Sequence, residues 1–238
     1  MEQQRDEGIE REHTGIARNQ HVLYLLPHEP AAVAQFLAPA LERAAGAERD
    51  DASSPGPRLL VITPDAETAV DVARTASHLP APPSVVPVTS ARRGARLLAA
   101  RAPDVVTGAP EALLELVRAS ALKLDAVRVL AVAWVDVIID SGATAALESL
   151  LNEVPKETAR TIVAAQDTPA VEAIVERYAR RPRRVGTPAE SSSEPLALRY
   201  LVTPAAARPA ALRRLLDELD PPAAAIYVHH DQSAEEAA

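Results

Sequence analysis

The segment Val127–Gly142 (VRVLAVAWVDVIIDSG) decides the fold that this sequence predicts. It opens as a nearly unbroken apolar run, which is typical of a strand buried on both faces of a parallel sheet. Asp136 and Asp140 follow the predicted strand. Because ligands of open α/β sheets bind at the carboxyl ends of the strands, any chemistry should be sought at this place.

Predicted strands and helices alternate on both sides of this segment. Further strands are expected at residues 21–26, 58–63, 84–89, 104–107 and 161–165. Helices are expected at residues 30–46, 66–78, 91–101, 111–120, 143–152 and 168–180. Strands that alternate with helices of this length indicate an α/β fold, with a parallel sheet and helices on both of its faces.

The alternation is interrupted once, by the polar stretch GTPAESSSEP. We expect a charged arm at 1–20, a first domain at 21–186, a linker at 187–197 and part of a second domain at 198–238. The last segment predicts strands at 198–203 and 223–229 around a helix at 206–219. Two strands cannot close a core and leave an unpaired edge, so we expect a protein partner or a second copy of the chain to cover it.

The composition excludes several classes of protein. The 238 residues contain no cysteine, which excludes disulfides and thiolate metal sites and fits a cytoplasmic protein. The net charge of −8 gives the surface as a whole no attraction for nucleic acid or anionic membranes. No apolar run reaches the ~18 residues of a membrane span, and the first 20 residues lack the apolar stretch of a secretory signal.

Several short motifs follow one another in a specific order. They are FLAPALER at 36–43, LVITPDAETAVDVA at 60–73, DVVTGAPEALLELV at 104–117, the opening segment at 127–142, TIVAAQDTP at 161–169 and ERYARRPRRV at 176–185. Their order and spacing resemble those of a DEAD-box RNA helicase. The family's motifs PTRELA, T-P-G-R, D-E-A-D and S-A-T follow one another in the same order. The resemblance implies a RecA-like fold for residues 21–186 and the start of a second RecA-like domain after it.

The resemblance also implies where a nucleotide would bind, and the residues needed there are missing. A phosphate-binding loop uses glycine N–H groups, a lysine and a hydroxyl that binds magnesium. The corresponding loop has no glycine, and Ala32 and Val33 stand for the lysine and the hydroxyl. Glu29 in the same loop should repel a phosphate.

The acids that would hold magnesium are missing as well. Ala133 and Trp134 stand at the acid pair of D-E-A-D, and only the last acid remains, as Asp136. Phosphoryl transfer is positioning and charge stabilisation, so losing the lysine, the hydroxyl and the metal ligands together should abolish it. We therefore expect no ATP, no cofactor and no metal in this helicase-like domain.

Some residues at this place have two interpretations. Asp136 and Asp140 are interpreted as turn and cap residues, and a residual metal site is the alternative. Trp134 is interpreted as a packing residue that fills the vacated nucleotide pocket, and stacking on a base or a partner is the alternative. The HHD sequence at 229–231 predicts no metal site, because adjacent residues of a strand point to opposite faces.

Three functions remain in competition. The first is a catalytically inactive protein-interaction or scaffold subunit of a larger assembly. The second is an ATP-independent RNA-binding accessory protein of the ribosome, of transcription or of RNA decay. Its candidate contacts are Arg92, Arg93 and Arg96, since arginine can hold phosphates bidentately. The third is an ATP-dependent RNA helicase with divergent motifs, which the missing ligands disfavour.

Overall fold

The computed structural model describes residues 20–45, 56–186 and 202–219. The chain divides into two compact units, Met1–Ser192 and Ser193–Ala238. The first unit contains the whole described sheet, and the second contains one described α-helix. Each unit is described on its own.

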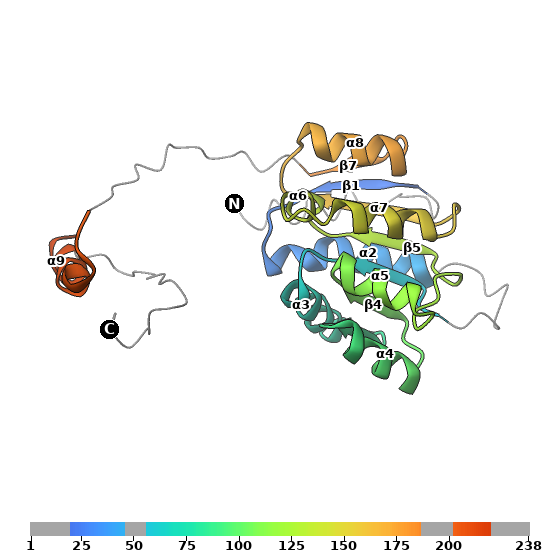
Figure 1. Ribbon diagram of the computed structural model, residues 1–238. Helices are drawn as coiled ribbons and strands as arrows, with labels where there is room; N and C mark the ends of the chain where they lie inside the picture. The colour runs from blue at the N-terminus through green and yellow to red at the C-terminus, as the bar shows by residue number, and fades with distance from the viewer. Residues whose placement is uncertain (1–19, 46–55, 187–201, 220–238) are drawn as a thin grey trace. The chain divides into compact units, whose positions relative to one another are not determined.

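The first unit is built on a seven-stranded, all-parallel sheet with the order β3-β4-β2-β5-β6-β1-β7 (Figure 1). Its strands are β1 (Val22–Leu25), β2 (Leu59–Ile62), β3 (Val85–Val88), β4 (Val105–Gly108), β5 (Val129–Val132), β6 (Ala159–Ala164) and β7 (Arg183–Val185). The predicted α/β fold with a parallel sheet is confirmed. Every strand expected within residues 21–186 is present within one or two residues, and β4 extends one residue beyond the expected range, to Gly108.

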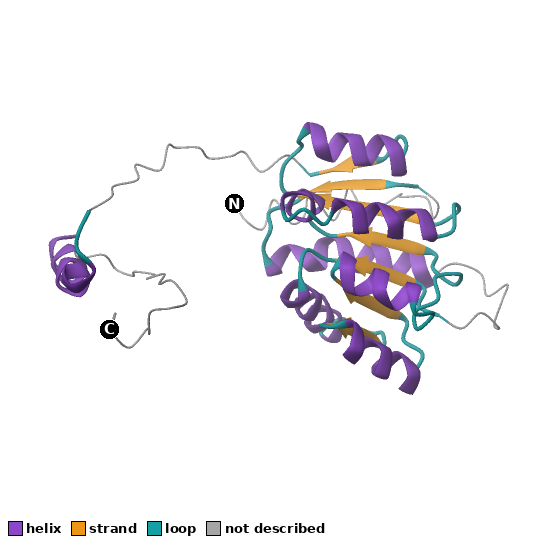
Figure 2. Cartoon of the chain, viewed as in Figure 1, coloured by secondary structure: helices purple, strands orange, loops and turns teal. Residues whose placement is uncertain are grey.

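Helices cover both faces of this sheet (Figure 2). They are η1 (Pro30–Ala32), α2 (Val33–Ala45), α3 (Ala66–Ser77), α4 (Ala91–Ala100), α5 (Pro110–Arg118), α6 (Val135–Asp140), α7 (Thr144–Glu153) and α8 (Pro169–Tyr178). Helices α2 and α3 pack with one apolar cluster, and α4, α5, α7 and α8 pack with the other. The sheet is therefore the middle of three layers.

Strand β5 lies in the middle of the sheet because it is apolar on both faces. Its four residues are buried, as are the four residues of the neighbouring strand β2. Leu130 and Val132 pack in one cluster, whereas Val129 and Ala131 pack in the other. A strand buried on both faces needs this continuous apolar sequence, which explains why the opening segment predicted the centre of the fold.

A few polar side chains fix the ends of the elements. Asp65 precedes α3, and its carboxylate accepts a hydrogen bond from the Thr68 N–H at 2.7 Å. Arg43 of α2 is buried and donates to the Thr161 hydroxyl at 3.1 Å. Burial lowers the pKa of Arg43, and burial also raises the pKa of Tyr24 to about 12.

His21, directly before β1, makes the stability of the domain depend on pH. Its Nδ1 atom accepts a hydrogen bond from the Arg160 N–H at 3.1 Å. Burial, followed by the charges of Arg160 and Arg43, lowers the pKa of His21 below its ordinary value. In the window just below about pH 6.5, the unfolded chain therefore binds more protons than the folded chain.

We expect the free energy of unfolding to fall as the pH is lowered from about 6.5 through the lower pKa of folded His21. Urea unfolding at a series of pH values measures this slope. The variant His21→Asn keeps an acceptor and does not titrate, so its slope in that window should be smaller. An unchanged slope would assign the pH dependence to other groups.

Thr107 of β4 pairs with Val61 of β2 in the sheet, and its fully buried hydroxyl has no hydrogen-bond partner among the described residues. An unsatisfied hydroxyl in an apolar core costs free energy. We expect Thr107→Val to raise the free energy of unfolding by about 1 kcal/mol. The variant Thr107→Ser keeps the hydroxyl and loses a methyl group, so urea unfolding should show it to be less stable than the original chain.

The second unit is described at residues 202–219, by η2 (Ala205–Ala207) and α9 (Arg208–Leu219). The helix agrees with the one expected at 206–219. Val202 and Thr203 lie outside any strand, so the end of the strand predicted at 198–203 is wrong. The charged arm at 1–19, the linker from 187 to 197, the strand at 223–229 and the HHD sequence at 229–231 lie outside the described residues.

Helices that could cross a bilayer were sought in the described ranges. None of the helices within residues 20–45, 56–186 and 202–219 combines the required length with the required apolar character.

Candidate functional site

The carboxyl ends of β1, β2 and β5 converge on one small region. The loop from β1 to η1 contributes His28, Glu29 and Pro30, and α3 after β2 contributes Thr68 and Asp71. Trp134 joins β5 to α6, and it lines the same region as the loop after β1 and α3. This is the edge of the sheet at which ligands of parallel α/β folds bind.

Trp134 occupies a strained corner of the backbone. The Ala133 N–H still belongs to the sheet and donates to the Ile62 carbonyl at 2.8 Å. At Trp134 the chain turns with φ 49° and ψ 61°, which is the left-handed region, and α6 begins at the next residue. A residue with a Cβ atom pays about 1–2 kcal/mol for this conformation. The contacts of the side chain must compensate that cost.

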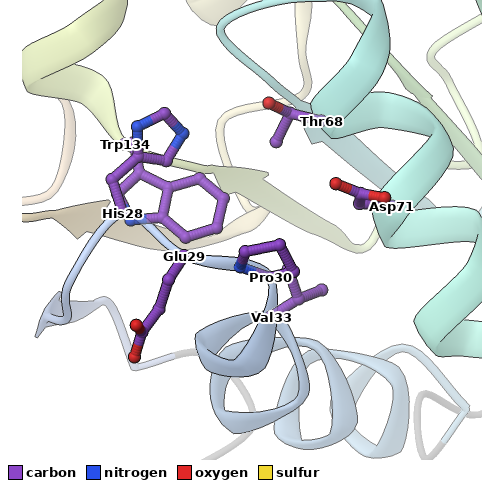
Figure 3. A pocket seen from close by; sticks show the side chains of 7 residues that line it. All are labelled: His28, Glu29, Pro30, Val33, Thr68, Asp71 and Trp134. Atoms are coloured by element: carbon purple, nitrogen blue, oxygen red, sulfur yellow. The ribbon is translucent and has the colours of Figure 1, made fainter. Parts of the chain in front are cut away.

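The Trp134 side chain makes several contacts, and Figure 3 shows the one with the His28 ring. The Trp134 side chain is buried, with 1% of the residue exposed. Its Nε1–H group donates to the Pro27 carbonyl at 3.1 Å. The ring of His28 lies 4.5 Å from the indole, and the ring of Phe36 meets it edge-on at 5.8 Å, both measured between centroids. Trp134 therefore ties the corner after β5 to the loop after β1.

Several backbone N–H and carbonyl groups of the loop after β1 form hydrogen bonds with one another. The Glu29 N–H donates to the Pro27 carbonyl, and the Ala32 N–H donates to the Glu29 carbonyl. The Val33 N–H donates to the Pro30 carbonyl, and Pro30 itself has no N–H group. Ala32 and Val33 are fully buried, whereas Glu29 is exposed. Three of the five N–H groups of residues 27–33 are therefore used within the loop, unlike the arrangement that cradles phosphates.

A pocket of about 50 Å³ remains at this edge. Seven residues line it: His28, Glu29, Pro30, Val33, Thr68, Asp71 and Trp134. Ligand pockets of proteins usually measure about 300–1,000 Å³. The space that remains is the size of one or two water molecules rather than of a nucleotide.

Asp136 lies in the first turn of α6 and binds the loop after β6. Its Oδ2 atom accepts hydrogen bonds from the Ala165 N–H at 3.0 Å and from the Gln166 N–H at 3.2 Å. Its Oδ1 atom is buried without a partner. Asp136 therefore joins the corner after β5 to the segment where the sequence AQD stands in place of S-A-T.

The structure corrects one expectation about this corner. We interpreted Asp136 and Asp140 as turn and cap residues after the strand, but both belong to the short helix α6: Asp136 lies in its first turn, and Asp140 is exposed at its last position. The sequence VDVIID is apolar at positions that suit either a strand or a helix, so periodicity alone could not separate them. The hydrogen bonds that Asp136 accepts from the loop after β6 hold the first turn of α6 in place.

The candidate RNA contacts lie away from this pocket, in the first half of α4. Arg92, Arg93 and Arg96 are exposed, and none of them forms an ion pair with another described residue. The second arginine group near β7 differs. Arg177 pairs with Glu148 at 2.9 Å, and Arg184 pairs with Asp167 and Glu172 at 2.9 and 2.5 Å.

Metal ligands do not gather in the described part of the chain. No group of three or more His, Asp or Glu side chains there could hold a metal ion. One carboxylate oxygen of Asp136 already accepts hydrogen bonds from two backbone N–H groups.

Sequence comparisons and structural comparisons give different kinds of result. No family model and no curated protein sequence matches this chain. Among solved structures, a DEAD box protein from the hyperthermophile Methanococcus jannaschii matches with a TM-score of 0.60 and 18% identity, over 88% of this chain and 55% of the other. The domain has a RecA-like fold similar to that structure. The likeness concerns the fold, because the identity is low.

A second helicase structure agrees with the first. A variant of S. cerevisiae Dbp5, bound to a variant of Gle1 and IP6, matches with a TM-score of 0.55 and 15% identity, over 70% of this chain. This chain spans 41% of the length of that protein and 55% of the M. jannaschii protein. The RecA-like fold predicted for the helicase-like domain is therefore confirmed.

The sequence reasoning did not find every residue of the pocket. It placed Glu29, Val33 and Trp134 at one site, and the structure brings these three residues together. It missed Thr68 and Asp71 of α3. The segment that contains both resembles the PTRELA segment of the family, but neither residue was singled out as a site residue.

Proposed function

We propose that this chain is a catalytically inactive, helicase-like protein that acts as a protein-interaction subunit of a larger assembly. One observation carries the proposal: the Trp134 side chain packs against the loop at 27–33 and fills most of the space at the edge where this fold would bind a nucleotide. The charge and the hydroxyl that phosphoryl transfer needs are missing from the same loop.

The energetic argument for inactivity is direct. To admit a nucleotide, the loop would have to release the Pro27 carbonyl from Trp134 and uncover a large aromatic ring. Neither Ala32 nor Val33 would then attract a phosphate, and Glu29 would repel it. Binding would therefore cost several favourable contacts and gain none of the usual charge-assisted ones.

The second unit supports the role in protein interaction. Helix α9 contains no buried residue among those described, although four leucines repeat along it at positions 212, 215, 216 and 219. Leu215 and Leu219 are 40% and 61% exposed. A helix with such an apolar stripe needs another element to cover it, and a protein partner or a second copy of the chain is one way to provide that cover.

Calorimetry with ATP and magnesium tests the inactivity of the purified chain. We expect no heat of binding and no phosphate release above the buffer rate, both with and without RNA. The same titration of Trp134→Ala asks whether removing the ring is enough to restore binding. We expect that it is not, because the lysine and the hydroxyl are still absent. ATP hydrolysis by the original chain would overturn the proposal.

RNA binding without ATP is the second candidate function. The observation that favours it is the cluster Arg92, Arg93 and Arg96, which is exposed and free of ion pairs within the described residues. Arg92 and Arg93 lie in the first turn of α4, which contains no acidic residue, and Arg96 lies in the second turn. The helix dipole and the arginines therefore add their positive potentials there.

If this surface binds RNA, the triple variant Arg92→Ala, Arg93→Ala, Arg96→Ala should weaken binding to single-stranded RNA by about tenfold or more at low salt. Fluorescence anisotropy over a range of salt concentrations measures the affinity and its salt slope. The control is Arg177→Ala, because Arg177 already pairs with Glu148. Equal losses in both variants would indicate a general charge effect, and no binding at low salt would remove this candidate.

A further inference from the structure

The charges of α9 are distributed against the electrostatics of a single helix. A helix carries partial positive charge at its N-terminus and partial negative charge at its C-terminus, so acids near the start and bases near the end stabilise it. In RPAALRRLLDEL the arginines come first and the acids last, and no acid lies in the first turn and no base in the last. A neighbour with the opposite direction of charge would therefore stabilise α9.

The charged side chains of α9 are available to such a neighbour. Arg213 and Arg214 each precede an acid by four residues, yet neither they nor Asp217 and Glu218 form an ion pair with another described residue. All four are exposed. A base that precedes an acid at this spacing is also the weaker order for an ion pair within one helix.

The leucines of the same helix form one stripe with internal symmetry. Since an α-helix turns by about 100° per residue, the leucines at 212, 215, 216 and 219 lie within an arc of about 100°. In LRRLLDEL the leucines are placed symmetrically about the midpoint between residues 215 and 216, and each arginine of the first half answers an acid of the second. A copy of α9 that runs antiparallel about this midpoint would place leucine opposite leucine.

The same arrangement brings opposite charges together. The helical repeat places Arg213 and Asp217 on one flank of the leucine stripe and Arg214 and Glu218 on the other. A two-fold axis through the midpoint sets each flank against the same flank of the second copy. Arg213 then lies within one residue of the level of the second Asp217, and Arg214 lies equally close to the second Glu218. A parallel pair would instead set arginine beside arginine and acid beside acid, which is destabilising.

We propose that α9 pairs antiparallel with α9 of a second copy of this chain. The pairing covers the leucine stripe, joins the four charged residues in intermolecular ion pairs and opposes the two helix dipoles. The inference deepens the proposed function and rests on it, because it names the partner of the protein-interaction subunit. A helix of 12 residues is about 18 Å long, so the contact is small, and we expect a dissociation constant of about 10 μM–1 mM.

Sedimentation equilibrium of the full chain at about 10 μM–1 mM measures the self-association. We expect a reversible change from one to two chains. Two double variants make the charges of α9 alike: Arg213→Glu with Arg214→Glu, and Asp217→Arg with Glu218→Arg. Each alone should self-associate at least about tenfold more weakly, whereas an equimolar mixture of the two should associate again. Such rescue cannot arise from misfolding of either variant.

An exchange variant is the matched control, because it keeps the net charge of the chain. It carries Arg213→Asp, Arg214→Glu, Asp217→Arg and Glu218→Arg, so its charges remain complementary in an antiparallel pair. We expect it to self-associate like the original chain but not to associate with a fluorescently labelled original chain. A parallel pair predicts the reverse of both results and would overturn the proposed geometry.

The remaining outcomes separate this inference from the proposed function. A chain that stays monomeric up to about 1 mM, or one whose self-association ignores all three sets of substitutions, would overturn the inference. Neither result changes the calorimetric test with ATP. Hydrolysis of ATP by the original chain would overturn the inactive function, whatever mass sedimentation measures.

Discussion

Trp134→Ala is expected to lower the free energy of unfolding by about 3–5 kcal/mol, the range for deleting a large buried aromatic side chain. The variant loses the contacts with His28 and Phe36 and leaves the Pro27 carbonyl without its donor. It keeps the left-handed backbone at position 134, which no longer has a side chain to compensate it. Urea unfolding followed by circular dichroism measures the change, since the variant has no tryptophan fluorescence.

Two further variants separate the contributions of Trp134. Trp134→Gly removes the same ring but adopts φ 49° without strain, so it should be about 1 kcal/mol more stable than Trp134→Ala. Trp134→Phe keeps most of the apolar surface and loses the hydrogen bond to Pro27, which predicts a loss of about 1–2 kcal/mol. If glycine were no better than alanine, the backbone at this corner would not be strained in solution.

Asp136→Ala is expected to destabilise the domain by about 2–3 kcal/mol. Its carboxylate accepts from the N–H groups of Ala165 and Gln166, and hydrogen bonds to a charged group contribute about 1.5–3 kcal/mol. Removing it leaves two backbone donors without an acceptor at the start of the loop before α8. The same urea titration measures the loss.

Asp136→Asn is the matched control, because an amide oxygen can accept from the same N–H groups without the charge. We expect it to lose about 1 kcal/mol, less than the alanine variant. Asp140→Ala tests the other acid of α6, which is exposed and forms no described hydrogen bond, and should change stability by less than about 0.5 kcal/mol. Equal effects at positions 136 and 140 would contradict the role assigned to Asp136.

The sequence was sufficient to predict the strands of the sheet, because each strand has a recognisable apolar pattern. Strands such as β2 and β5 are buried on both faces and must be apolar throughout, which no surface element requires. The first residues of helices could also be predicted where the preceding side chain caps the helix, as Asp65 and Ser90 do. The order of the strands in the sheet was not predicted from the sequence.

The site was predictable only in part, because its chemistry depends on contacts between distant segments. The sequence identified Trp134 and the loop at 27–33 as unusual, but a hydrogen bond across 107 residues cannot be read from either segment alone. Helix α6 was missed because VDVIID has no decisive period. Thr68 and Asp71 gave no signal, since both are ordinary residues of an amphipathic helix until Trp134 is placed opposite them.

The corner after β5 holds the loop after β1 through Trp134 and the loop after β6 through Asp136. Both bonds are made by groups of the chain itself, so they form at any concentration of any small molecule. Three loops at the edge where ligands of this fold bind are thus joined to one another without a ligand. A partner that recognises this edge would find it the same in a starved cell as in a growing one.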